Sequence, residues 1–209
     1  MPPLVSGPDG RRRCPWGAPT PEYVAYHDEE WGRPVRDERG LYERLVLEGF
    51  QSGLSWLTIL RKRDNFRAAF RDFEIEAVAC FGERDVGRLL KDEGIVRHRG
   101  KIEAAIANAR AAAAMHEGGE SLSELIWSHA PPRRRRAPRA HEDVPAVTPE
   151  STALAKELKR RGFRFVGPTT AYALMQACGL VNDHIVGCWV RGEVTRALRA
   201  REYPPRGDG

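Results

Sequence analysis

The amino-acid sequence predicts an all-α protein, and two observations carry that prediction. Apolar residues recur at steps of three and four, as in Leu41 and Leu45 and again in Leu54, Leu57 and Leu60, which is the spacing of one buried helix face. No segment alternates apolar and polar residues as a half-buried strand does, and no internal repeat is present. Helices packed on helices are therefore the expected architecture.

Helix-start signals define the expected elements. Thr20 before Pro21, and Thr148 before Pro149, each place an N-cap residue ahead of a proline suited to the first helical position. The first pair predicts a short helix that carries Tyr26, His27 and Trp31. Two helices broken near Gly49 to Gly53 are expected within residues 37–70, and further helices at about 84–92, 99–116, 120–128, 150–161 and 168–178.

Length and cysteine usage indicate a protein that needs no disulfides. A chain of 209 residues can bury a sizeable core, and its 4 cysteines lack the short spacings of a disulfide framework. Residues 14–190 are expected to form a single domain. The amino terminus lacks the apolar stretch of a secretory signal, so a cytoplasmic location is expected. No run of about 18 apolar residues exists, and no membrane association is expected.

The charge balance permits a polyanionic partner. The chain carries 34 basic and 29 acidic residues, and its pI is about 9.2. Basic residues gather at 11–13, 97–101 and 131–141. The last cluster is proline-rich and indicates an exposed loop, either a solvated linker or a surface for DNA. Residues 1–13 offer little to pack and are expected to be a mobile basic tail, and residues 191–209 a C-terminal tail.

Two Cys/His pairs near opposite ends of the chain suggest a metal site. His184 precedes Cys188 by four residues, so in a helix both side chains would lie on one face and could reach the same ion. Cys14 and His27 are the best candidates for a second pair. Four protein ligands would leave no open position and make the metal structural. The alternative is a core histidine that lies beside a buried cysteine.

The segment from 159 to 179 resembles the helix-hairpin-helix of DNA repair enzymes. One helix ends at Gly162, "FRFVG" makes a tight turn, and a new helix opens at Pro168. In that motif, placed here at about 156–178, backbone N–H groups around the turn face a phosphate. The alternative is an ordinary corner between two helices. The candidate DNA-binding residues are Gly162, Phe163, Val166, Gly167, Thr169 and Thr170.

Two positions depart from the glycosylases that carry this hairpin. Bifunctional members have a lysine that forms a Schiff base with the sugar where this chain has Thr169. A hydroxyl cannot form an iminium, so strand-nicking lyase chemistry is not expected. Their catalytic aspartate aligns with Asn182, which cannot act as a carboxylate, although Asp183 beside it could help to position the loop.

Several motifs in order carry a more specific resemblance. "YHDEEWG", "LEGFQSGLSW", "GIVRHRGKI", "GFRFVG" and "MQACGLVNDH", between Cys14-Pro-Trp16 and Cys188, resemble the Tag family of 3-methyladenine DNA glycosylase I over about residues 14–190. The resemblance implies the helix-hairpin-helix DNA glycosylase fold with one structural zinc ion that joins the amino- and carboxy-terminal segments. It places the zinc on Cys14, His27, His184 and Cys188.

The resemblance also implies an activity. The enzyme would flip 3-methyladenine out of alkylated double-stranded DNA and hydrolyse its N-glycosidic bond, leaving an abasic site for base excision repair. Glu48 would contact the base, Trp56 would stack on it, and Trp16, Tyr26 and Trp31 would complete the pocket. A base methylated at N3 is cationic, so aromatic faces and a buried carboxylate suit it.

Two alternatives remain from the sequence. One is a zinc-containing DNA-binding module without catalysis, and the other is a broader glycosylase that also removes 7-methylguanine or 3-methylguanine. A monomer is expected, since one lobe holds one flipped base.

Overall fold

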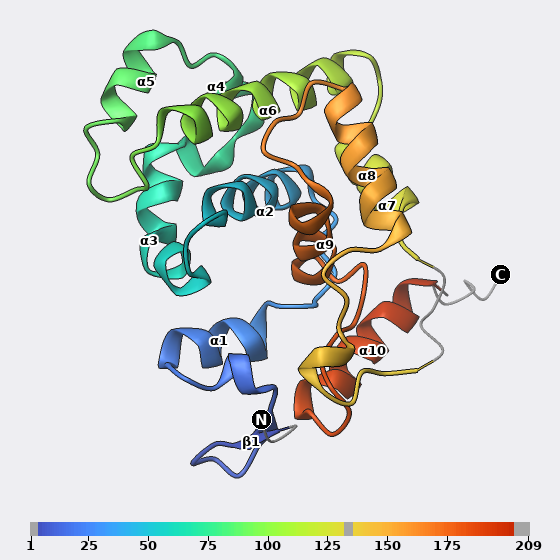
Figure 1. The fold of residues 1–209 in the computed structure, drawn as a ribbon. Coiled ribbons are helices and arrows are strands. Elements are labelled where there is room, and N and C mark those ends of the chain that lie inside the picture. The colour runs from blue at the N-terminus through green and yellow to red at the C-terminus, as the bar shows by residue number, and fades with distance from the viewer. Residues whose placement is uncertain (1–3, 132–135, 203–209) are drawn as a thin grey trace, which may run out of the picture. The chain divides into compact units, whose positions relative to one another are not determined.

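The computed structural model describes residues 4–131 and 136–202, and their regular structure is almost entirely helical, as predicted (Figure 1). The predicted break within residues 37–70 lies between two helices, at residues 52–55. In chain order the elements are β1 (Val5–Ser6), β2 (Arg12–Arg13), η1 (Pro15–Gly17), α1 (Pro21–Glu29), α2 (Glu38–Gln51), α3 (Trp56–Ala69), η2 (Arg71–Phe73), α4 (Ile75–Ala79), α5 (Glu83–Leu89), α6 (Arg99–Glu117), α7 (Leu122–Ser128), η3 (His141–Asp143), α8 (Pro149–Arg160), α9 (Pro168–Ala177) and α10 (Trp189–Glu202).

The chain divides into two compact units. Unit 1 comprises Met1–Val35, Pro131–Ala146 and Met175–Gly209, and unit 2 comprises Arg36–Ala130 and Val147–Leu174. Unit 1 therefore contains both of the predicted Cys/His pairs, Cys14 with His27 and His184 with Cys188. The expectation of a single glycosylase domain over residues 14–190 stays a prediction.

Unit 2 contains a core of aromatic rings beneath capped helices. Asp37 caps α2 by accepting a hydrogen bond from the Gly40 amide at 2.7 Å, and Ser55 caps α3 in the same way. Tyr42 on α2 is fully buried, and its hydroxyl donates to the Ala105 carbonyl on α6 at 2.9 Å. The buried rings beneath these helices are Phe50, Phe66, Phe70 and Phe73. This packing fixes α2 and the segment that leads from it into α3.

The amino-terminal residues correct the expectation of a tail with nothing to pack. β1 and β2 pair antiparallel, with Val5 opposite Arg13. Arg13 is only 4% exposed, because carboxylates on both sides neutralise its guanidinium. Sequence reasoning treated the arginines as solvated and so missed the carboxylates that pair with this one.

The carboxy-terminal residues also differ from the expected tail. α10 extends over residues 189–202, and residues 203–209 lie outside the described part of the chain. Val190 and Val194 are buried and Leu198 packs against them. These residues are spaced four apart, so they form one helix stripe within an arginine-rich segment.

The basic loop at 131–141 lies partly outside the described residues, which omit 132–135. Arg136 and Arg139 are exposed, as expected for a loop. The Pro138 carbonyl accepts a hydrogen bond from the Val186 amide at 2.8 Å. This part of the loop is therefore attached to unit 1 by its backbone.

Candidate functional site

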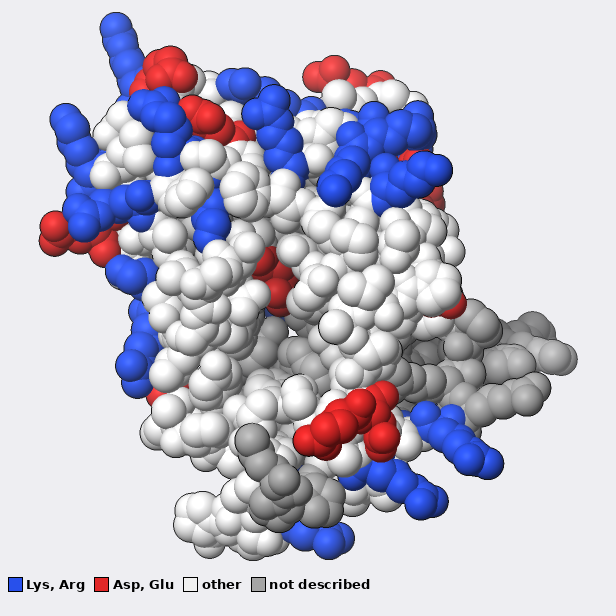
Figure 2. Space-filling view, in the orientation of Figure 1, with Lys and Arg blue, Asp and Glu red and all other residues white. Residues whose placement is uncertain are grey.

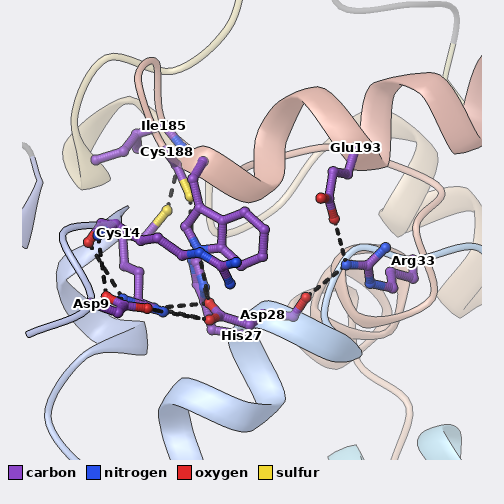
Figure 3. Close-up of polar contacts among 11 residues, drawn as sticks. Asp9, Cys14, His27, Asp28, Arg33, Ile185, Cys188 and Glu193 are labelled. Atoms are coloured by element: carbon purple, nitrogen blue, oxygen red, sulfur yellow. Dashed lines mark hydrogen bonds and ion pairs between the residues drawn. The ribbon is translucent and has the colours of Figure 1, made fainter. Parts of the chain in front are cut away.

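Three of the four predicted metal ligands converge in unit 1. The ligand atoms of Cys14, His27 and Cys188 all lie within 4.8 Å of one another, and all three side chains are buried (Figure 3). Cys14 precedes η1, His27 lies on α1, and Cys188 directly precedes α10. Three separate segments of the chain thus supply one site that could hold a metal ion.

The expectation that His184 and Cys188 share a helix face is wrong. Residues 178–188 form turns and extended backbone between α9 and α10, and the Cys188 amide donates to the Ile185 carbonyl at 3.0 Å. Gly179 and Gly187, at φ +76° and +87°, allow turns that a side chain would strain. The loop therefore places His184 and Cys188 by its own geometry.

His184 presents an unused donor atom to this site. Its side chain is fully buried, and its Nδ1 lies 3.0 Å from the Asn182 Oδ1. Within the described residues, its buried Nε2 has no hydrogen-bond partner. The ring centroids of His184 and His27 are 5.0 Å apart. Burial, with the nearby His27, lowers the pKa of His184 to about 3, so its imidazole is neutral, the form that binds a metal.

The other donor atoms are oriented by second contacts. His27 Nδ1 lies 2.8 Å from the Asp28 carboxylate, which leaves its Nε2 directed at the Cys188 sulfur, 3.5 Å away. Hydrogen bonds from the Cys14 thiol and from His27 outweigh burial and lower the pKa of the Cys188 thiol. A carboxylate behind a histidine is the usual support of a metal-binding imidazole.

Two glycines allow the histidine rings to approach the backbone. A β-carbon at Gly17 would lie 2.4 Å from a ring carbon of His27, and one at Gly32 would lie 2.9 Å from a ring carbon of His184. Both distances are shorter than van der Waals contact. The glycines are therefore part of what makes room for the two rings.

The predicted pocket residues of unit 1 surround this site. The centroid of Trp16 lies 6.4 Å from that of Tyr26 and 4.7 Å from that of Trp31, both edge to face. Trp31 in turn lies 4.7 Å from the His184 ring. The structure thus brings these three aromatic residues together beside the histidines.

Unit 2 holds the predicted carboxylate, Glu48. Glu48 lies on α2 and is 6% exposed, and burial, opposed only partly by Arg44, raises its pKa to about 8. Within the described residues, no hydrogen bond or ion pair reaches its carboxylate. Trp56, half-buried, is the first residue of α3, eight positions further on. A buried carboxylate without a hydrogen-bonded partner is costly, which favours a role for it in binding.

Lys101 is a supporting residue near Glu48 that the sequence did not indicate. It belongs to the basic cluster at 97–101, but it is buried, and its Nζ donates to the carbonyls of Phe50, at 2.8 Å, and Ser52. These carbonyls end α2, so Lys101 holds the segment that joins Glu48 to Trp56. A lysine among arginines gives no signal of burial in the sequence.

The segment predicted to form the hairpin consists of α8, a turn and α9, and the turn lies in unit 2. α8 ends in a turn where the Phe163 amide bonds to the Leu158 carbonyl and the Gly162 amide to the Lys159 carbonyl, with Gly162 at φ +94°. Phe163 and Val166 are buried, so only their backbone could meet DNA. Gly167, Thr169 and Thr170 lie at the start of α9, where the first amides have no acceptor within the helix.

A buried asparagine fixes this hairpin. The Asn108 Oδ1 accepts from the Arg164 amide at 2.7 Å, and its Nδ2 donates to the Arg164 carbonyl at 3.2 Å. Phe165, the next residue, is exposed and has φ +54°, a conformation rare for an aromatic residue. The asparagine therefore compensates a strained turn, and the alanine-rich helix around it gave no sign of this role.

We expect Asn108→Ala to cost about 1–3 kcal/mol of stability, because it leaves both backbone groups of Arg164 unpaired. We also expect weaker binding to duplex DNA, because the turn would no longer be held. Thermal unfolding and DNA titrations would measure the two effects. Asn65→Ala is the matched control, since Asn65 is exposed and donates to the Gly94 carbonyl in the same unit. Unchanged DNA affinity in Asn108→Ala would contradict a DNA contact at this turn.

The two loop residues that depart from the pattern of the hairpin glycosylases, Asn182 and Asp183, form hydrogen bonds within unit 1. Asn182 donates to the Arg191 carbonyl and the Thr195 hydroxyl, and its Oδ1 accepts from the His184 amide. Asp183 is buried and accepts a hydrogen bond from Gln176 at 3.0 Å. Asn182 thus orients a candidate metal ligand.

Comparisons with known proteins identify the family of this chain. The family profile of methyladenine glycosylases matches residues 16–191. DNA-3-methyladenine glycosylase 1 of Escherichia coli (strain K12) is 52% identical over 178 residues, which are 84% of this chain and 95% of that protein.

Solved structures show the same fold. A crystal structure of 3-methyladenine DNA glycosylase I (TAG) matches with a TM-score of 0.82 at 52% identity, covering 85% of this chain and 98% of that one. A tyrosine-to-phenylalanine variant of 3-methyladenine DNA glycosylase I, in complex with 3-methyladenine, matches with a TM-score of 0.81 at 36% identity, over 86% and 97% of the two chains. The chain therefore belongs to the methyladenine glycosylase family and is a DNA glycosylase of the 3-methyladenine DNA glycosylase I (Tag) type.

Proposed function

We propose that this protein excises 3-methyladenine from alkylated double-stranded DNA by hydrolysing the N-glycosidic bond, which leaves an abasic site for base excision repair. Relatives that carry this name, and a related structure in complex with 3-methyladenine, support the substrate. The observation that carries the proposal is Glu48, a buried carboxylate that lacks a hydrogen-bonded partner in the described residues. A cationic base supplies the charge that such a carboxylate requires.

The chemistry follows from the charge of the damaged base. A base methylated at N3 is cationic while it is bonded to deoxyribose, so it is a good leaving group and needs little acid catalysis. The protein has to extrude the nucleotide at a cost of a few kcal/mol and hold the base. Glu48 would accept a hydrogen bond from the exocyclic amino group, and Trp56 would stack on the ring. Neutral adenine would bind less well because it lacks the charge.

The C1′–N9 bond would break in a dissociative step, in which the base leaves with the bonding electron pair. Water would then add to C1′ of the sugar. Positioning and strain of the bound nucleotide would supply most of the acceleration. Thr169 stands where a lysine would form an iminium, so the proposed enzyme cuts no DNA strand.

The donor set fits one structural zinc ion. Two thiols and two imidazoles, from Cys14, His27, His184 and Cys188, are a usual set for closed zinc sites. The unpartnered Nε2 of His184 supports its place as the fourth ligand. The ion would join the two ends of the chain and take no part in the reaction.

The surface charge of unit 2 suits a DNA partner. Lys and Arg side chains gather over α3 and α5 and over α8 on the face drawn in Figure 2. We propose that residues 162–170 contact the DNA backbone and that the protein acts as a monomer in the cytoplasm. No helix among the described residues has the length and apolar character needed to cross a bilayer.

Release of free bases from methylated duplex DNA tests the proposal. We expect 3-methyladenine to appear while the strands stay intact until the abasic sites are cleaved by alkali. Release of 7-methylguanine or 3-methylguanine at a comparable rate would establish the broader specificity instead. A folded protein that binds the DNA but releases no base would overturn the proposal.

A further inference from the structure

The first residues of the chain form a hairpin that lies against the candidate metal site. Residues 4–13 precede the segment matched by the family, residues 16–191, and contain β1 and β2. Leu4 packs against the apolar cluster of Cys14, Ile185, Cys188, Val190 and Val194. Both predicted sulfur ligands therefore belong to a cluster that this hairpin helps to cover.

Charged side chains connect the hairpin to His27. Arg13 donates to both oxygens of Asp9, at 2.9 and 2.6 Å, and to both oxygens of Asp28, at 3.0 and 2.7 Å. Asp28 then contacts the Nδ1 of His27 at 2.8 Å (Figure 3). The arrangement is a continuous chain from an exposed carboxylate to a predicted ligand.

Each residue of this chain restricts the orientation of the side chain that follows it. An arginine fork that bonds both oxygens fixes the plane of a carboxylate, which a point charge would leave free to rotate. Asp28 also accepts from the indole Nε1 of Trp189 at 3.2 Å, and Arg11 lies over that indole, 4.0 Å from its centroid. The hairpin thus acts on Asp28 both directly and through Trp189.

We propose that the hairpin of residues 4–13 is a clasp that retains the metal ion, with Arg13 and Asp9 as positioning residues that orient His27 through Asp28. The clasp rests on the metal-binding part of the proposed function. It predicts slow metal release in the intact protein. Groups behind a metal-binding histidine typically change metal affinity by about 10- to 100-fold, which sets the size of the expected effect.

Zinc release to an excess of a colorimetric chelator tests the clasp, at a temperature where every variant is folded. We expect the unaltered protein to carry one zinc ion and to lose it slowly, and Arg13→Met to release it about 10-fold faster or more. Asp9→Asn should give a smaller acceleration because Arg13 keeps Asp28. Arg13→Lys should lie between, since lysine restores the charge but not the fork. Arg12→Met is the matched control, because Arg12 is exposed and adjacent in the hairpin.

A second readout separates orientation of His27 from general loosening. With cobalt(II) in place of zinc, Arg13→Met should change the visible absorption bands, and Arg12→Met should leave them as they are. Equal release rates in all variants of a zinc-loaded protein would overturn the clasp alone. Failure of the unaltered protein to bind zinc would overturn the metal site and the clasp together.

Discussion

Glu48→Gln should reduce kcat/KM for 3-methyladenine release by about 10²–10³-fold, the usual cost of removing one electrostatic partner of a reacting group. The amide has the shape of the carboxylate but no charge to pair with the cationic base. Single-turnover release of free 3-methyladenine from methylated DNA measures the loss. The same variant should be at least as stable as the original protein, which distinguishes lost chemistry from lost fold.

The stability expectation follows from the direction of the pKa shift. Burial raises the pKa of Glu48 from 4.5 to about 8, so between these values the folded protein holds a proton that the unfolded chain has released. The free energy of unfolding therefore falls as pH rises from about 4.5 to about 8, by about 1.4 kcal/mol per pH unit. Glutamine mimics the protonated form. Glu48→Gln should match the original protein at pH 5 and exceed its stability at pH 9 by a few kcal/mol.

The same shift predicts a pH dependence of activity. In the free enzyme Glu48 is largely protonated at pH 7, and pairing with the cationic base requires the ionised form. The value of kcat/KM, which reports the free enzyme, should rise with pH, reach half its maximum near pH 8 and level off above about pH 9. Glu48→Gln should lack this rise.

Glu43→Gln is the matched control for both measurements. Glu43 lies on the same helix and is also largely buried, but its carboxylate already accepts from the Arg67 Nε at 2.9 Å. Its loss should cost stability and leave base release nearly unchanged. If the two glutamine variants retain equal activity, Glu48 is not the base-contacting carboxylate.

The sequence predicted those helices whose signals are local. Thr20 and Thr148 cap α1 and α8, as their position before a proline indicated. The sequence did not predict α10, because several arginines separate the apolar residues of its buried stripe. It did not predict the β1–β2 hairpin, because strands of two residues each are too short to show alternation. Both depend on contacts within unit 1 that join residues far apart in the sequence.

The site was predictable where the residue type determines the chemistry. Cysteine and histidine at both ends of the chain indicated a metal site, and Cys14, His27 and Cys188 do meet. The supporting residues were not predictable, because any arginine or asparagine of the chain could equally be solvated. The supporting roles of Arg13 and Asn108 can be recognised only in the folded structure, because their hydrogen-bond partners are far away in the sequence.

His184→Ala should abolish the stabilisation that the metal provides. An ion that binds only the folded state adds about 4 kcal/mol when its free concentration is 1,000 times Kd. For a chain of this size, 1 kcal/mol corresponds to about 2–4 °C in Tm, so removal of the metal should lower Tm by about 8–16 °C. We expect EDTA to shift the original protein by this amount and to leave His184→Ala nearly unchanged. Metal analysis should find about one zinc per chain only in the former.

Comparing Tm with and without EDTA for the same variant cancels the loss of stability that the substitution itself causes. His184→Ala leaves a cavity in unit 1, and that cost is present with and without EDTA, so the EDTA-dependent shift reports the metal alone. Cys178→Ala is the control, because Cys178 is a fully buried cysteine of the same unit that is not among the predicted ligands. It should keep both its zinc and its sensitivity to EDTA. If His184→Ala retains both, then Cys14, His27 and Cys188 hold the ion without it, and the buried Nε2 of His184 requires another partner.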